Sequence, residues 1–281
     1  MYSNFHTHTI YCDGHNTVEE MVAAAIEKQM PRLGISSHAP LPVSAQWSLT
    51  DENEIAKYID DIDASRRLHG DNISIFKSLE VDYIPGMTHP FSQIKKKWGL
   101  DYIIGAVHLV RVPESDNVWF IDGKQSFFNE GIDKFFGGDG KKACFTYLKQ
   151  VKEMIDTQEF DIIAHFDKIK LNNAGRFFKE NEEWYIRETD EILQLLKSKD
   201  IIVEINTRGF YQRKIDDFYP SDWLVEKACK MGIRVMVNSD AHRCSELTSG
   251  FPEAYKLLKD LNHHKVMDFE NGQWIERPLT F

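Results

Sequence analysis

Short apolar stretches alternate along this chain with segments whose apolar residues recur at helical spacing. Seven segments predict short β-strands: 4–9, 32–37, 73–81, 102–107, 160–164, 201–206 and 234–238. Capping signals predict helices between them, because Thr17 and Glu20 have capping-box spacing and Asp51 and Glu54 repeat it. Alternating strands and helices are typical of an α/β fold with parallel strands. The pattern therefore predicts seven β–α units, with no internal repeat.

Six of the seven predicted strands end at a histidine or a carboxylate, in the runs FHTH, SH, LE, VH, AH and SDAH. The carboxyl ends of parallel strands gather at one face of a sheet or barrel, so these side chains should converge. Imidazole and carboxylate groups in this number predict a metal cluster. The candidates are His6, His8, His38, Glu80, His108, His165, Asp240 and His242.

Each candidate also has an ordinary explanation when taken alone. An HxH pair such as His6 and His8 is a weak signal, and His38 could be a hydrogen-bonded histidine at a strand end. Glu80 is harder to explain, because an unpaired carboxylate in an apolar strand is costly. Asp13 adds a further candidate from the loop after the first strand, although an Asp-Gly turn would also account for it. If each of these ordinary explanations held, several unrelated polar residues would have to stand at the same end of the strands by coincidence.

Loops at the same predicted end of the strands carry further candidates. Segment 109–140 is long for a loop and rich in Asp, Gly and aromatic residues, which favours a lid over a disordered linker. Segments 168–179 and 207–220 carry Arg176, Arg208 and Arg213, whose guanidinium groups suit phosphate oxygens. The tail, 266–275, predicts a hairpin around Asn271-Gly272.

Composition narrows the classes of partner. The formal net charge of −10 argues against non-specific nucleic-acid binding but permits an anionic substrate, because bound cations can dominate a site. Four scattered cysteines form no CxxC pair, which favours a reducing compartment. A secretory signal and a membrane-length apolar run are both absent from the sequence. We therefore expect a cytoplasmic protein without nucleic-acid or membrane partners, and the sequence leaves its oligomeric state open.

The candidate residues stand within a recognisable set of motifs. The runs FHTHT…CDG, SSHAP, SLEVDY, GAVHLV, AHFD and NSDAH resemble the polymerase-and-histidinol-phosphatase (PHP) family of metal-dependent phosphoesterases, in the family's order and over nearly the whole chain. Within that family, VHLV followed by WFIDG, FGGD and NTRGFYQRKIDDFYPS looks most like the monofunctional histidinol-phosphatases. The resemblance implies a distorted seven-stranded (β/α)7 barrel, TIM-like, in a single domain over 1–281, in agreement with the strand count.

The resemblance also implies three divalent metal ions, for which the mixed nitrogen and oxygen ligands suit Zn, Mn or Fe. By position in the motifs, one ion would be held by His6, His8, Glu80 and Asp240. Glu80 would bridge to a second ion, held also by His108 and His165. A third ion would be held by Asp13, His38 and His242, with His15 as a competitor for the place of Asp13.

The activity implied is hydrolysis of L-histidinol phosphate to L-histidinol and phosphate, a step of histidine biosynthesis, by a metal-activated water. Arg208, after the sixth predicted strand, is the best-placed phosphate ligand, followed by Arg213 and Arg176. Asp240 or His242 could assist the leaving alcohol. Lid residues Asp122, Trp119 and Phe120 could line the substrate pocket, or the aromatics could only pack the lid down. The alternatives are another small phosphate ester or nucleotide as substrate, and a metal-binding interaction module without catalysis.

Overall fold

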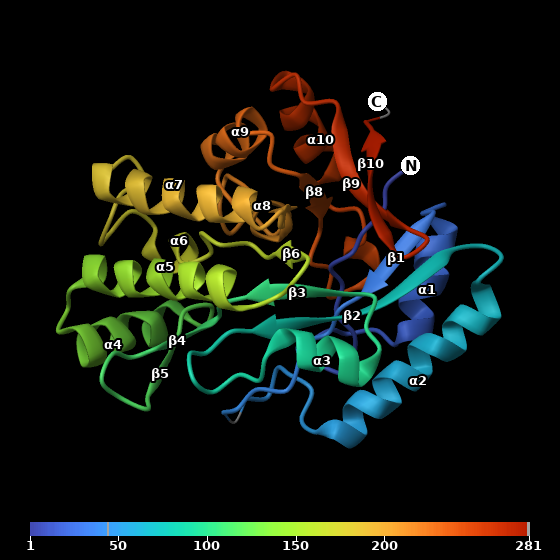
Figure 1. Ribbon diagram of the computed structural model, residues 1–281, viewed down its shortest axis with the longest axis horizontal. Helices are drawn as coiled ribbons and strands as arrows, with labels where there is room; N and C mark the ends of the chain where they lie inside the picture. The colour runs from blue at the N-terminus through green and yellow to red at the C-terminus, as the bar shows by residue number, and fades with distance from the viewer. Residues whose placement is uncertain (44, 280–281) are drawn as a thin grey trace.

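The computed structural model describes residues 1–43 and 45–279. A curled sheet of six parallel strands forms the centre of the molecule, in the order β1-β2-β3-β6-β7-β8 (Figure 1). The strands are β1 (Arg32–Ile35), β2 (Ser74–Asp82), β3 (Tyr102–Ala106), β6 (Ile162–Ile163), β7 (Ile202–Asn206) and β8 (Val235–Asn238). The prediction of an α/β fold with parallel strands is confirmed, and each of these six strands falls within one residue of a predicted segment or inside it.

The first predicted strand, 4–9, is not one of the six. Isolated parallel bridges join Asn4 to Leu33 beside β1 and Thr7 to Ala241 beyond β8, so this segment lies between the two edges of the curled sheet. Side chains interrupt its ladder, because the Phe5 N–H donates to Asn238 Oδ1 and the Thr7 N–H donates to Ser36 Oγ. The segment therefore reaches both edges without forming a regular strand.

Helices cover the outer face of the sheet, and capping explains where two of them begin. Thr17 and Glu20 form the predicted capping box at the start of α1 (Val18–Glu27). Asp51 caps α2 (Glu52–His69) by accepting from the Glu54 N–H. The remaining principal helices are α3 (Phe91–Trp98), α5 (Gly140–Thr157), α7 (Glu183–Ser198), α9 (Asp222–Lys230) and α10 (Phe251–Asp260). None of the described helices has the length and apolar character that crossing a membrane requires.

Segment 109–140 is folded against the rest of the molecule. It contains the antiparallel pair β4 (Leu109–Arg111) and β5 (Val118–Phe120), followed by α4 (Gln125–Phe136). Trp119 and Phe128 are buried, and Trp119 Nε1 donates to the Phe128 carbonyl. The aromatic content that favoured a lid over a disordered linker thus forms a local core.

The C-terminal hairpin closes the end of the sheet at which β3, β6 and β7 begin. β9 (Lys265–Glu270) and β10 (Gln273–Pro278) pair around Asn271 and Gly272, as predicted. Both turn residues have positive φ, 51° and 76°, which suits an Asn-Gly turn. Met267 and Phe269 pack with Phe5 and Tyr102 in the interior of the curled sheet.

Candidate metal centre

The structure brings all nine predicted ligands into one cluster. Their ligand atoms fall into overlapping groups, within each of which the atoms lie within 4.8 Å of one another. The groups are His8-Asp13-His38-His242, His6-His8-Glu80, His6-His165-Asp240 and Glu80-His108-His165. Residues from positions 6 to 242 meet because each lies within or shortly after a strand, or the bridging segment 4–9, toward the carboxyl end of the sheet.

Glu80 lies at the centre of the cluster, near the end of β2. Its Oε2 lies 3.2 Å from His6 Nε2 and 3.0 Å from His38 Nδ1. Its Oε1 lies 3.0 Å from His165 Nε2 and 3.8 Å from His108 Nε2. The two carboxylate oxygens therefore face different sets of imidazoles, and the side chain is 1% exposed.

Two members of the cluster have unusual backbone conformations. Asp240 has φ 51° and His165 has φ 38°, in the left-handed region that residues other than glycine rarely adopt. The turn at Asp240 places its Oδ1 3.2 Å from His8 Nε2 and 3.9 Å from His6 Nε2. Such conformations also occur in ordinary turns, as at Asn271, but a buried residue held in one at a ligand cluster is a feature that functional sites share.

Asp13 reaches the cluster although its side chain is 39% exposed, and among the described residues its competitor His15 belongs to none of the ligand groups. Asp13 Oδ1 lies 3.0 Å from His242 Nε2 and 3.7 Å from His38 Nε2. His15 is exposed, and its backbone N–H donates to the His242 carbonyl. The geometry therefore favours Asp13 over His15 as a ligand.

The protonation of the cluster suits cation binding. Burial lowers the pKa of His8, His38 and His165, which leaves these imidazoles neutral with a lone pair to offer. Burial opposes ionisation of Glu80 and Asp240, but the surrounding histidines hold the pKa of both carboxyls well below the usual range. Burial also acts on His6 and His108, but nearby carboxylates, chiefly Glu204 and Asp82, outweigh it and raise the pKa of His6 well above its usual value and that of His108 to about 9. The site thus offers three neutral imidazoles and two ionised carboxylates, together with two imidazoles that release a proton when they bind a cation.

Sequence reasoning missed two buried carboxylates that orient the histidines. Glu204 Oε1 lies 2.7 Å from His6 Nδ1, and Asp82 Oδ2 lies 3.0 Å from His108 Nδ1. Each fixes the ring so that Nε2 points into the cluster, a typical arrangement behind metal-binding histidines. Both had a signal in the sequence. Glu204 stands in an apolar strand as Glu80 does, and Asp82 shares a strand face with Glu80 at the i+2 position.

A buried lysine was also missed. Lys168 follows β6, and its Nζ lies 2.8 Å from Asp122 Oδ2 in segment 109–140 and 3.4 Å from His108 Nε2. Burial alone would lower the pKa of Lys168, but Asp122, Asp240 and Glu80 together outweigh this effect and raise it, so the ammonium stays charged. Lys168 therefore places a positive charge at the edge of the cluster.

The three predicted arginines lie in different surroundings. Arg208 Nη1 donates to the Asp240 carbonyl at 2.8 Å and to Tyr211 Oη at 3.1 Å, so this guanidinium borders the cluster. Arg213 is exposed. Arg176 donates to Asn129 Oδ1 on α4 and to the Asn172 carbonyl, so its side chain is directed toward α4. The geometry supports Arg208 ahead of the other two.

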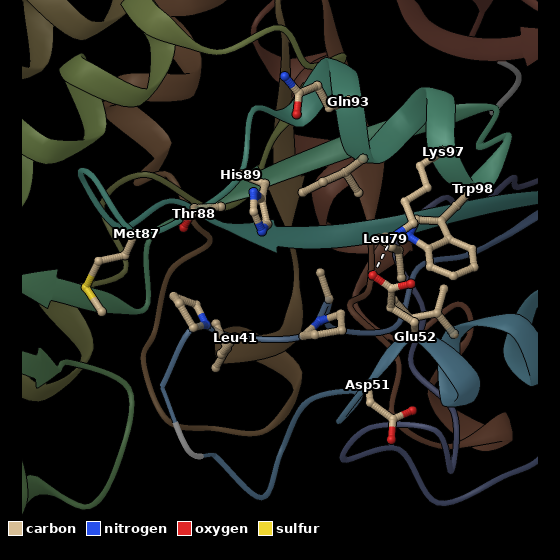
Figure 2. Close-up of a pocket in the computed structure, with 15 residues that line it drawn as sticks. Leu41, Asp51, Glu52, Leu79, Met87, Thr88, His89, Gln93, Lys97 and Trp98 are labelled. Atoms are coloured by element: carbon tan, nitrogen blue, oxygen red, sulfur yellow. Dashed lines mark hydrogen bonds and ion pairs between the residues drawn. The ribbon is translucent and has the colours of Figure 1, made fainter.

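A separate cavity of about 490 Å³ lies between segment 39–42, the start of α2 and helix α3 (Figure 2). Its lining includes Leu41, His89 and Trp98, and the Glu52–Lys97 ion pair lies at its side. None of the nine predicted ligands lines it, although Ala39 in its wall directly follows His38. The candidate chemistry is therefore not in this cavity.

Comparison with known proteins agrees with the geometry. The family model described as PHP domain matches residues 4–208. A protein of Deinococcus radiodurans named as a probable histidinol-phosphatase is 26% identical over 265 residues, covering 93% of this chain and 94% of the relative.

Two solved structures resemble the fold. A Listeria monocytogenes protein, provisionally named a histidinol phosphatase, superimposes with a TM-score of 0.80 at 25% identity, covering 89% of this chain and 99% of its own. Histidinol phosphate phosphatase from Lactococcus lactis, solved with zinc, L-histidinol and phosphate, gives a TM-score of 0.70 at 18% identity, covering 98% of each chain.

Proposed function

The chain belongs to the PHP domain family, and on that premise we propose that it is a metal-dependent phosphatase that hydrolyses L-histidinol phosphate to L-histidinol and phosphate. The observation that carries the proposal is the convergence of nine histidine and carboxylate ligands at one end of the sheet. The relative from Deinococcus radiodurans, matched over nearly its whole length, supports this substrate, which would place the chain in histidine biosynthesis.

The residues present fit divalent cations. His6 Nε2, His8 Nε2, His38 Nδ1 and His165 Nε2 are buried and have no hydrogen-bond partner among the described residues, and the same is true of Glu80 Oε1. Buried polar atoms without partners are costly, and here they all point into one space. Cations at the cluster would satisfy all of them together.

We assign the ligands to three ions. His6, His8, Glu80 and Asp240 would hold one; Glu80, His108 and His165 a second; and Asp13, His38 and His242 a third. Zn, Mn and Fe all suit this mixture of imidazole and carboxylate. With segment 4–8 counted as a seventh member, the sheet would be a distorted seven-stranded barrel in a single domain over 1–281, with 109–140 as its lid.

Divalent ions at this site would supply a lowered pKa for a bound water and stabilisation of charge on the phosphate. The chain's own residues would do the rest. Arg208 and Lys168 would place positive charge beside the phosphate from two sides of the cluster. Asp240 or His242 would lie where the leaving alcohol takes up a proton. Glu204 and Asp82 would keep His6 and His108 in the orientation that binding needs.

Purified protein should contain divalent metal and hydrolyse histidinol phosphate more efficiently than the other members of a panel of phosphate esters. The panel includes small sugar phosphates and nucleotides, and metal content is measured by elemental analysis. A chelator should abolish turnover, and added Zn, Mn or Fe should restore it. Efficient hydrolysis of a nucleotide with none of histidinol phosphate would contradict the proposed substrate. Metal content without turnover of any ester would favour a binding module.

Asp82→Asn should weaken metal binding and activity by roughly 10–100-fold, because an amide holds the His108 imidazole less firmly than a carboxylate. The measurements are metal affinity by competition with a chelator and kcat at saturating metal. Asp116→Asn is the matched control, because Asp116 is a lid carboxylate that is 99% exposed. Equal metal affinity in Asp82→Asn and the control would show that Asp82 does not orient the ligand.

A further inference from the structure

Two aromatic side chains from different segments meet beside the metal centre. Trp47 comes from the loop after β1 and Phe120 from the end of β5, and their rings stack with centroids 5.6 Å apart and an interplanar angle of 13°. The Trp47 ring also meets two predicted ligands edge to face, with centroids 4.6 Å from His38 and 5.7 Å from His108. The aromatic pair therefore stands directly against the cluster.

Phe120 and its neighbour Trp119 point to opposite faces of β5, so their roles differ. Trp119 is 2% exposed and packs within the lid against Phe128 and Phe136. Phe120 is the next residue of β5, so its side chain points to the opposite face, where it is partly exposed and meets Trp47. Trp119 thus packs the lid down, which leaves Phe120 free to line the site.

Trp47 is held in place by its own loop. Ser48 and Leu49 after it are buried, and the Leu49 N–H donates to the carbonyl of His38 at 3.1 Å. The loop is thereby tied to a predicted ligand, while the Trp47 ring itself remains partly exposed. A partly exposed indole fixed beside buried imidazoles has an aromatic surface to offer a ligand.

We propose that Trp47 and Phe120 form an aromatic wall that selects phosphate esters whose alcohol carries a flat ring. The inference rests on the proposed function. With the phosphate at the metal cluster, the rest of the substrate lies at the edge of the cluster, beside Trp47 and Phe120. Asp122, two residues after Phe120, is paired with Lys168, so its charge is balanced there. The surface that Trp47 and Phe120 offer to the substrate ring is therefore apolar and polarisable. Aromatic faces stack with an imidazole and attract its protonated form.

The test compares two substrates that differ only in the ring: histidinol phosphate and alaninol phosphate, the corresponding amino-alcohol phosphate without imidazole. Trp47→Leu and Phe120→Leu should each lower kcat/KM for histidinol phosphate by roughly tenfold, the size of one lost stacking contact. Turnover of alaninol phosphate and metal content should hardly change. Phe127→Leu is the matched control, because Phe127 is a lid aromatic that is 55% exposed and stands on α4.

An equal fall for both substrates would overturn the inference, since the wall would then act on the metals or the fold and not on the ring. Failure of the proposed function gives a different result: the wild-type protein would not hydrolyse histidinol phosphate. In that case the same variants are compared on phenethyl phosphate and ethyl phosphate. A ring preference that is lost in Trp47→Leu supports the wall, and a preference that is unchanged refutes it.

Discussion

Glu80→Gln should lower kcat by at least about a hundredfold while leaving the protein folded. Glu80 is the carboxylate whose two oxygens face separate sets of imidazoles, so in the proposed site it holds two ions at once. An amide offers one neutral oxygen in place of two that share a negative charge. Charge stabilisation by bound ions is worth several kcal/mol, and each 1.36 kcal/mol is tenfold in rate. The measurements are steady-state kinetics on histidinol phosphate and metal content.

The control for burial is Glu188→Gln. Glu188 is also a buried glutamate, on α7, where it pairs with Lys152. It should tolerate the change with nearly normal activity, whatever the change does to stability. Thermal unfolding is measured on metal-free protein, because bound metal itself stabilises a fold. A Glu80→Gln enzyme with full metal content and wild-type turnover would rule out the shared ligand.

The sequence predicted the cluster better than it predicted the individual elements. His38, Glu80 and His165 follow the strand-end rule, which depends only on where parallel strands finish and tolerates errors of one or two residues at their ends. The prediction of strands was less accurate where side-chain oxygens, and not backbone carbonyls, accept the backbone N–H groups of a segment. Asn238 and Ser36 accept from N–H groups of segment 4–9, so this segment does not form a regular strand.

The surroundings of the cluster were only partly predictable. Glu204 and Asp82 were accessible to the same reasoning as Glu80, which concerns buried carboxylates in apolar strands. Trp47 carried no such signal, because nothing in the local pattern shows that a loop residue after β1 will meet Phe120 of the lid. That contact depends on how two segments far apart in the sequence pack together, which neither periodicity nor capping determines.

Arg208→Lys should lower kcat/KM for histidinol phosphate by roughly tenfold to a thousandfold, with little change in folding or metal content. The Arg208 side chain is tied through Nη1 to the Asp240 carbonyl, Tyr211 and Glu246, so the fork is held rigidly at the border of the cluster. Lysine keeps the charge but loses the planar fork that can contact two phosphate oxygens. One or two charge-assisted hydrogen bonds are worth about 1.5–3 kcal/mol each.

A positioning role for Arg208 would give a different result. Its bond to the Asp240 carbonyl could hold that strained residue in place, and the variant would then lose metal as well as rate. Metal affinity and the inhibition constant of inorganic phosphate are therefore measured together. Weaker phosphate inhibition at full metal content supports a direct contact with substrate.

Arg213→Lys, in an exposed residue of the same loop, is the control and should leave both quantities unchanged. If Arg208→Lys binds phosphate and hydrolyses histidinol phosphate as the wild type does, the contact must belong to another cation, and Lys168, beside His108, is then the first to substitute.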